Sequence, residues 1–243
     1  MKFQKFSFSI SLGKDISMNV KKIKIDTRTV VGIAVFSALA FVLSLVIRFP
    51  VMFLTFDVKD AIICVAAFLY GPIAAPIISV LVALLELVTV SSTGLYGFLM
   101  NFFSSAALAT VASLIYRKWR SLNGAIVSML CAVLSMVSVM MLANILITPY
   151  FMGAPRTTVI NMIPSVLFPF NLAKGLLNAA IALLLYKPTK VAMKRAGLLK
   201  RKVDAKSVTL AEEFRFTKST GIILAVAGQM IIVAVVIFYI LLK

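Results

Sequence analysis

The sequence predicts an all-α integral membrane protein, and three observations support this fold class. Hydrophobic residues make up 62% of the 243 residues, and the mean hydropathy is +1.07, whereas soluble domains are about half apolar. The apolar residues fall in long blocks with few charges, which is the pattern of membrane-spanning segments. The basic residues lie between those blocks. We expect helices, since a backbone that faces lipid must satisfy its own hydrogen bonds.

The first helix is expected over residues 30–47, where a long apolar run ends at "RFP". A loop follows over 51–60. A short second helix covers 60–69 and stops at "YGP", because glycine and proline interrupt helices. The third helix begins at Pro72, since proline is tolerated in a first helical turn, and it runs to about residue 90.

Four more apolar helices follow. They cover 98–116, 124–148, 165–186 and 219–242. The basic sequence "RKWR" follows the fourth helix, and a basic linker separates the last two. The chain therefore divides into four parts: a basic tail over 1–29, a membrane domain of six helices over 30–186, the linker over 187–218, and an additional transmembrane helix over 219–243.

The distribution of lysine and arginine predicts the orientation of the helices, because cytoplasmic segments are enriched in both. With the N-terminus in the cytoplasm, the tail, "RKWR" and the linker place 20 of the 25 basic residues inside. Arg48, Lys59, Arg156 and Lys243 fall outside, and Lys174 lies within the sixth helix. We therefore predict a multi-pass protein of a bacterial plasma membrane with a cytoplasmic N-terminus. Topology and anionic lipid explain the net charge of +17, and no nucleic-acid partner is expected.

The sequence lacks several groups on which enzymes commonly depend. It contains no histidine, which removes the commonest general base and the commonest metal ligand. Cys64 and Cys131 both lie in apolar stretches, which is typical of buried packing residues. No G-x-x-x-x-G-K-[ST] phosphate loop and no metal-ligand spacing occurs. We expect no catalytic residue, no metal and no cofactor.

Lys174 lies near the middle of the sixth helix, and no carboxylate lies within a helical turn of it. Asn171 and Asn178 are three residues before it and four residues after it, so all three share one helical face. A charged group within the membrane is costly, and it is a candidate for function. A structural ion pair between Lys174 and Glu86 is the alternative hypothesis.

Other polar side chains fall toward the outer end of the predicted bundle. Asn144 lies near the outer end of the fifth helix, Asn101 begins the fourth, and Asp57 and Asp60 stand in the first external loop. The inner half is nearly all apolar, so we predict a pocket that is open to the outside and closed below. Interhelical hydrogen bonds by the amides and solvation of the two loop aspartates are the alternatives.

Three stretches of the chain resemble a known family. They are "IRFPVMFLTFDVKD" with the later "LYGPIAA", "LANILITPY" in the fifth helix, and "FPFNLAKG" in the sixth. They are similar to segments of the substrate-binding S component of energy-coupling factor (ECF) vitamin importers, most of all the riboflavin-specific type. The resemblance covers about residues 28–187. It implies a six-helix bundle with an outward-facing pocket, which joins a transmembrane coupling protein and two ATPase subunits.

The resemblance also implies which residues bind the ligand, riboflavin or its phosphate FMN. The polar edge of the isoalloxazine ring would form hydrogen bonds with Lys174, Asn171 and Asn144. The first external loop would help to cover or contact the ligand through Leu54, Thr55, Phe56 and Asp57. A flavin has an apolar body and a carbonyl-rich edge, which suit apolar walls and a few buried polar groups. Ala34 and Ala38 would contact the coupling protein, since small residues let helices approach closely.

The sequence thus predicts a riboflavin-binding S component that catalyses no covalent reaction. One alternative is an S component for another vitamin, such as thiamine or pantothenate. A second is an intramembrane lipid enzyme, although the clustered carboxylates or the base that such enzymes need are missing. A third is a ligand-free membrane scaffold, in which Lys174 and Glu86 would form an ion pair. The seventh helix departs from the family pattern.

Overall fold

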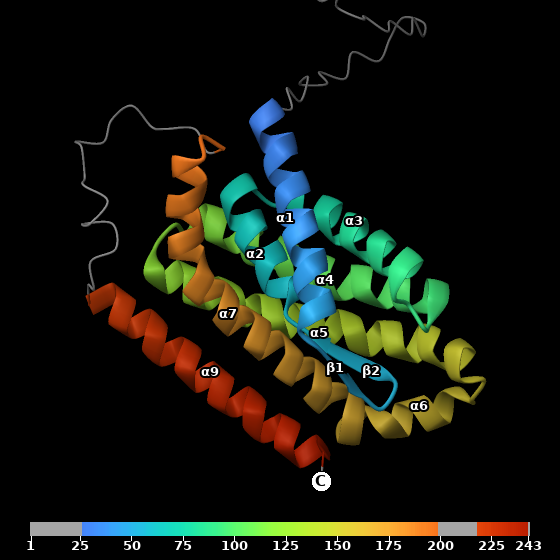
Figure 1. Ribbon diagram of the computed structural model, residues 1–243. Coiled ribbons are helices and arrows are strands. Elements are labelled where there is room, and N and C mark those ends of the chain that lie inside the picture. Colours follow the sequence, from blue (N-terminus) through green and yellow to red (C-terminus); the bar gives the residue numbers. More distant parts are fainter. Residues whose placement is uncertain (1–25, 199–217, 243) are drawn as a thin grey trace, which may run out of the picture.

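The computed structural model describes residues 26–198 and 218–242, and within these ranges the protein is a helical bundle with one small β-hairpin (Figure 1). The helices are α1 (Thr27–Val46), α2 (Lys59–Tyr70), α3 (Ala74–Thr89), α4 (Gly94–Lys118), α5 (Leu122–Met152), α6 (Arg156–Met162), the π-helix η1 (Ile163–Leu167), α7 (Phe168–Arg195) and α9 (Lys218–Leu242). The strands are β1 (Arg48–Val51) and β2 (Leu54–Asp57). Most of the predicted basic tail and linker lies outside the described residues.

Length and composition confirm the predicted membrane fold. In the described part of the chain, five helical segments are long and apolar enough to cross a membrane. They are Thr27–Val46, Gly94–Lys118, Asn123–Met152, Arg156–Arg195 and Gly221–Leu241. The short helix α2 contacts α1, α4 and α7, and it is buried from Lys59 to Ala67. The chain is therefore an all-α, multi-pass membrane protein, and α2 lies at its centre.

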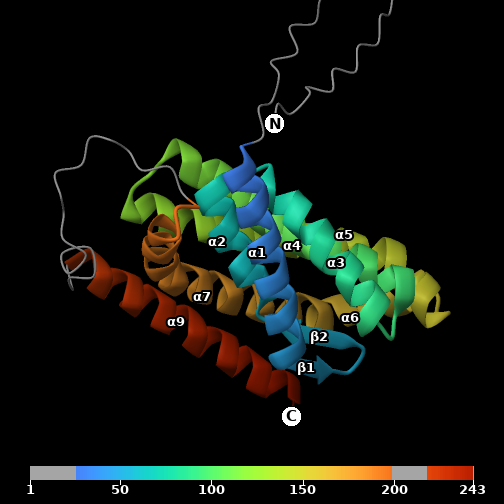
Figure 2. The same ribbon diagram turned by 45° about the horizontal axis from the view of Figure 1, so that its top comes forward.

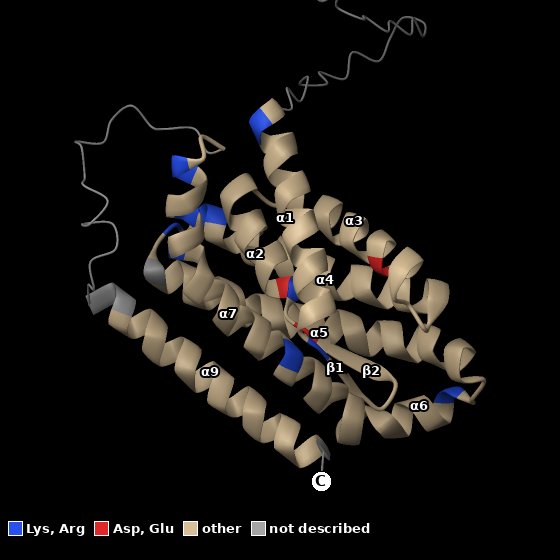
Figure 3. Ribbon diagram, in the orientation of Figure 1, with Lys and Arg blue, Asp and Glu red and all other residues tan. Residues whose placement is uncertain are grey.

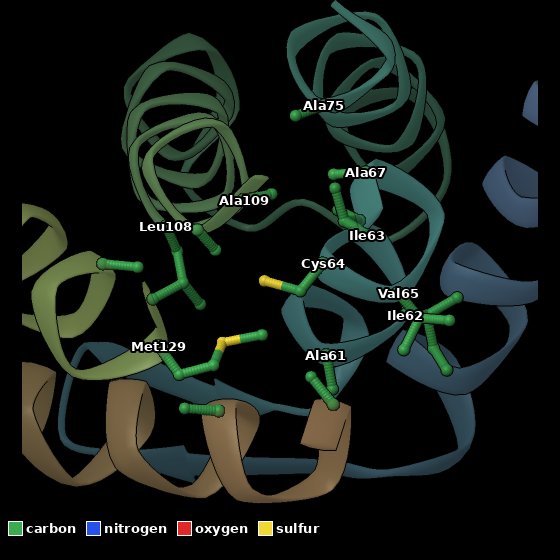
Figure 4. Packing of buried hydrophobic residues seen from close by; sticks show 14 of the residues in the cluster. Ala61, Ile62, Ile63, Cys64, Val65, Ala67, Ala75, Leu108, Ala109 and Met129 are labelled. Carbon is green, nitrogen blue, oxygen red and sulfur yellow. The ribbon is translucent and has the colours of Figure 1, made fainter. Parts of the chain in front are cut away.

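The apolar core forms around α2 and is built from small and branched side chains (Figure 4). Cys64 of α2 points toward Leu108 of α4 and Met129 of α5, and all three are fully buried. Ile63 is fully buried too, on another side of α2. Burial confirms the predicted packing role for Cys64. The same prediction was wrong for Cys131, which is exposed on the outer surface of α5, because an apolar stretch does not distinguish a core-facing residue from a lipid-facing one.

The segment predicted as a loop over 51–60 folds as an antiparallel hairpin followed by the first turn of α2. Arg48 pairs with Asp57 and Val51 pairs with Leu54, so Met52 and Phe53 form a two-residue turn. Met52 has a φ of 55°, a left-handed conformation that is uncommon for a residue with a side chain. Each strand has only four residues, which is too short for a clear alternating pattern in the sequence.

The helix predicted over 165–186 is longer at both ends. α6, η1 and α7 run on from one another between Arg156 and Arg195, with the π-helical turn in between. The helix also continues through Pro188, which removes one backbone hydrogen bond. Val191 and Met193 are buried beyond this proline, and their burial offsets that loss. The predicted domain boundary at 186 therefore falls inside a helix.

The additional C-terminal helix lies on the outside of the bundle. α9 runs alongside α7, and its C-terminal end reaches the β-hairpin (Figures 1 and 2). Basic residues gather at the other side of the molecule, away from the hairpin (Figure 3). They belong to the start of α1, the end of α4 with the α4–α5 connection, and the end of α7, and they include Arg28, Arg117, Lys118, Arg120, Lys190, Lys194 and Arg195. The bundle thus has one basic end and one end that carries the hairpin.

Candidate functional site

A cavity opens at the hairpin end of the bundle, and it is lined by the hairpin, α3, α4, α5 and α7. Its empty volume is about 1040 Å³, counting the open mouth, which is at the upper end of the range for small-molecule pockets. The side chains of Met140, Ile147 and Phe170 give it apolar walls. Lysine, asparagine and carboxylate groups gather in the same cavity, so it joins an apolar body with a polar end.

Lys174 lines this cavity and is paired with carboxylates of the hairpin end. Its Nζ lies 2.9 Å from Asp57 Oδ2 and 4.0 Å from Asp60 Oδ2. The predicted alternative of a Lys174–Glu86 pair was therefore wrong. The hairpin folds back onto α7 and brings Asp57, 117 residues away in the sequence, against the lysine. The costly charge of Lys174 is compensated by Asp57, which is only 2% exposed, and not by a residue of its own helix.

Glu86 pairs instead with Lys59, at the start of α2. Lys59 Nζ donates to both carboxylate oxygens of Glu86, at 2.7 and 2.8 Å, and it lies 3.3 Å from Asp57 Oδ2. Asn101 Nδ2 donates to Glu86 Oε2 at 2.9 Å. Lys59 was predicted to lie in an external loop, yet it is 2% exposed. The feature of the sequence that could have indicated a buried charge cluster is "DVKD", which places three charges in four residues directly before an apolar helix.

Asp60 is also buried, so the hypothesis of solvated loop aspartates was wrong for both residues. The hydroxyl groups of Ser104 and Ser105 on α4 donate to its carboxylate. Asp57 Oδ1, by contrast, is buried without a hydrogen-bond partner among the described residues. Three of the four acidic residues in the described ranges meet Lys59 and Lys174 here. Two ammonium groups thus face three carboxylates, and one buried acceptor oxygen has no hydrogen-bond partner among the described residues.

Asn144 and Asn171 line the cavity from α5 and α7. Each donates to the carbonyl four residues earlier in its own helix, at 2.7 Å for Asn144 and 2.8 Å for Asn171. Asn144 Oδ1 also accepts from Thr148 at 2.9 Å. Within the described chain neither amide bridges two helices, so the interhelical role suggested for them was wrong. Both remain beside the cavity.

Asn178 has the structural role instead. Its Nδ2 donates to the carbonyl of Asp57 at 2.9 Å, and its Oδ1 accepts from the backbone N–H of Ala61 at 2.8 Å. These two bonds tie α7 to the junction between β2 and α2. They fix the position of Asp57 along α7. The carboxylate of Asp57 therefore meets Lys174, which lies one helical turn before Asn178 on the same face of α7.

The hairpin residues divide between the cavity and its far side. Leu54, Thr55 and Asp57 line the cavity. Phe56 does not, because its side chain points to the face opposite to that of its neighbours Thr55 and Asp57. Its ring lies 6.4 Å from that of Phe170 and 5.6 Å from that of Phe238. The hairpin therefore places Phe56 behind the cavity wall, where it does not cover a ligand directly.

Two further features bear on the predicted site. Arg48, which is paired with Asp57 across the hairpin, lines the cavity too, as do Tyr96 and Phe151, whose rings are 6.2 Å apart. Sequence inspection missed these three residues, because none lies in a polar cluster of its own. Ala34 and Ala38 are exposed on α1 and do not line the cavity, so they are available to a neighbouring helix.

A family model for the substrate-specific component of ECF transporters matches residues 28–186. The chain is an S component. It is also 30% identical over 180 residues to the riboflavin transporter RibU of Staphylococcus aureus (strain TCH60), covering 70% of this chain and 94% of that protein. A solved S component of a bacterial ECF transporter shares 28% identity at a TM-score of 0.60, covering 70% of this chain and 99% of that one.

The family assignment decides two of the sequence-based hypotheses. An S component is part of a transporter and not an enzyme, which confirms the expectation of no covalent chemistry and excludes the intramembrane lipid enzyme. The match ends at residue 186, so the last turns of α7 and all of α9 lie beyond it. The additional helix is therefore a feature of this S component outside the family match.

Proposed function

We propose that this S component binds riboflavin in the cavity at the hairpin end of the bundle. The polar end of the cavity carries the proposal, because it complements the pyrimidine edge of a flavin. That edge presents two carbonyl oxygens with an N–H between them. Lys174, Asn144 and Asn171 supply donors for the carbonyls, and the buried, unpaired Oδ1 of Asp57 is the acceptor proposed for the N–H. The 30% identity to a riboflavin transporter supports the same ligand.

The remaining predicted residues have secondary parts in this proposal. Leu54 and Thr55 cover the ring from the hairpin, with Thr55 beside the lysine: its carbonyl lies 3.5 Å from Lys174 Nζ. Phe56 acts from behind the cavity wall by supporting Phe170. FMN carries the same ring, and whether its phosphate is accepted depends on the open mouth of the cavity rather than on this polar end.

The proposed orientation places the cavity outside the cell and the N-terminus in the cytoplasm of a bacterial plasma membrane. The basic end of the bundle supports it, because positively charged segments remain on the cytoplasmic side. The hairpin lies at the opposite end (Figure 3), and its residues Leu54, Thr55 and Asp57 line the cavity. In this orientation the cavity captures the vitamin outside and closes toward the inner half of the bundle.

Absorption spectroscopy of the purified full-length protein tests the ligand. Protein prepared in mild detergent from cells grown with riboflavin is expected to show flavin bands and to release flavin in near-equimolar amount on denaturation. Unlabelled FMN, thiamine and pantothenate, each added in competition, separate riboflavin from the other vitamins. A colourless preparation that also fails to quench riboflavin fluorescence would contradict the proposed ligand.

We further propose that α1 contacts the transmembrane coupling protein of an ECF transporter, and that two ATPase subunits drive release of the vitamin into the cell. The exposed small side chains of Ala34 and Ala38 support this contact. They are four residues apart and lie on one face of α1, where they allow a second helix to approach closely.

Replacing Ala34 by leucine is expected to lower ATP-dependent riboflavin uptake by roughly tenfold or more, because the larger side chain prevents close helix packing. The dissociation constant for riboflavin is expected to stay unchanged, since Ala34 does not line the cavity. Uptake into cells that contain the coupling protein and ATPases is the measurement. Ala225→Leu, a matched change at an exposed position of α9, is the control, and equal uptake by the two variants would contradict this interface.

A further inference from the structure

The additional helix α9 makes a direct contact with the ligand-site hairpin. The ring of Phe238 lies 5.6 Å from that of Phe56 at an angle of 61°, which is an edge-to-face geometry. Phe56 in turn meets Phe170 of α7 at 6.4 Å and 89°. Figures 1 and 2 show the C-terminal part of α9 beside the hairpin in both views. One chain of three aromatic rings thus joins α9, the hairpin and α7.

This aromatic chain belongs to a small apolar cluster that is separate from the main core. Its buried members are Val51, Phe56 and Phe170, and Leu54, Leu177, Phe238 and Leu241 pack against them. Two of these residues, Leu54 and Phe170, also line the cavity. The cluster is therefore continuous from the outermost helix to the wall of the ligand site.

The hairpin depends on its neighbours for its stability. A two-stranded hairpin is marginally stable by itself, and each of its strands has only four residues. Met52, at its turn, has the left-handed φ of 55°, and such a conformation is maintained only when surrounding structure enforces it. Apolar contacts on the side away from the cavity, which include Phe238 and Leu241 of α9, supply part of that enforcement.

We propose that α9 is a positioning helix that holds the hairpin against the ligand cavity through the Phe238–Phe56 contact and so slows release of the ligand. Thr55 and Asp57 project to the cavity, and Phe56 between them projects to α9. Because these three residues are consecutive in one strand, fixing the ring of Phe56 also fixes Thr55 and Asp57. The identity of the ligand rests on the proposed function, whereas the inference that α9 holds the hairpin in place does not depend on which ligand binds.

The contribution of α9 differs from that of lipid at the same place. Acyl chains are as apolar as a phenylalanine ring, so burial alone gives no preference for a helix over lipid. A ring with a fixed position provides a shaped surface instead, and edge-to-face pairs are stabilising beyond the area they bury. Loss of Phe238 is therefore expected to loosen the hairpin without unfolding the bundle.

Hydrogen–deuterium exchange of the ligand-free, full-length protein in lipid nanodiscs tests the proposal. Phe238→Ala is expected to speed exchange in residues 48–57 between about twofold and tenfold, with exchange in α2 and α5 unchanged. Tyr239→Ala removes a neighbouring ring that is 66% exposed and is expected to have no effect. Phe238→Tyr, which keeps the ring, is expected to restore slow exchange. Equal exchange of the hairpin in Phe238→Ala and wild type would overturn the proposal.

The rate of riboflavin release gives the second measurement. Phe238→Ala is expected to raise the dissociation rate of riboflavin by the same factor as the exchange rate of the hairpin. The association rate is expected to stay within about twofold of the wild-type value. A wild-type protein that binds no riboflavin would overturn the proposed function, and the exchange experiment would still decide the role of α9. If Phe238→Ala does not fold, Phe238→Leu removes the ring and keeps most of the apolar volume, and the same comparison applies.

Discussion

Replacing Lys174 by methionine is expected to weaken riboflavin binding by about thirtyfold or more. The change removes the ammonium group that faces the cavity, and it leaves the buried Asp57 with only Lys59, at 3.3 Å. Methionine has a similar length and is apolar, so the cavity walls are preserved. Titration of riboflavin fluorescence with the purified variant in detergent measures the dissociation constant. An unchanged affinity would contradict the assignment of Lys174 to the ligand site.

A double variant separates ligand binding from a purely structural ion pair. Lys174→Met with Asp57→Asn removes both charges of the 2.9 Å pair and keeps an oxygen acceptor at position 57. If the Lys174–Asp57 pair is only structural, the double variant is expected to regain both stability and wild-type riboflavin affinity. If Lys174 binds the ligand, stability recovers but affinity stays low. Uptake assays on the same variants connect either outcome to transport.

Replacing Lys59 by methionine is expected to lower the free energy of unfolding by about 3–5 kcal/mol. Lys59 donates to both oxygens of Glu86, and it also lies beside Asp57. Its removal leaves Glu86 with Asn101 as its remaining side-chain donor in the described structure. Both carboxylates are buried, so the uncompensated charge has little access to water. A thermal unfolding midpoint lower by about 10 °C in detergent is the expected measurement.

Two comparisons decide whether the loss comes from the buried charge. Lys59→Met with Glu86→Gln removes the charged pair together and is expected to recover most of the stability, because a neutral pair needs no counterion. Lys118→Met, the same substitution at an exposed position near the basic end, is expected to change the midpoint little. A midpoint for Lys59→Met equal to that of Lys118→Met would show that the buried pair is not a stability determinant.

Local patterns were sufficient to predict the helices and several residues that share the cavity. Lys174 and Asn171 fall on one face of α7 by helical spacing alone, and Asn144 was assigned by resemblance; the structure brings all three to one cavity. The helix ends were less predictable, as at Pro188, where burial of Val191 and Met193 in the folded bundle maintains a helix that local rules would end.

The ion pairs were not predictable, because nothing local chooses among the available partners. Lys174 had three candidate carboxylates, and the sequence-based hypothesis selected Glu86. The hairpin instead folds back so that Asp57 meets Lys174, and α2 starts so that Lys59 meets Glu86. Each contact joins residues far apart in the sequence, 117 and 27 positions respectively. Only the packing of the elements determines which charges meet.

The sequence by itself determined that this protein is a membrane-spanning helical bundle with a resemblance to S components, because the lipid environment imposes long apolar segments and internal backbone hydrogen bonds. The tertiary structure decided the rest of the site: Lys59 is buried, Phe56 faces α9, and Asp57 keeps one buried oxygen without a hydrogen-bond partner in the described structure. The physical reason is that hydropathy acts on each segment separately, whereas charge pairing and the two faces of a short hairpin depend on which segments become neighbours.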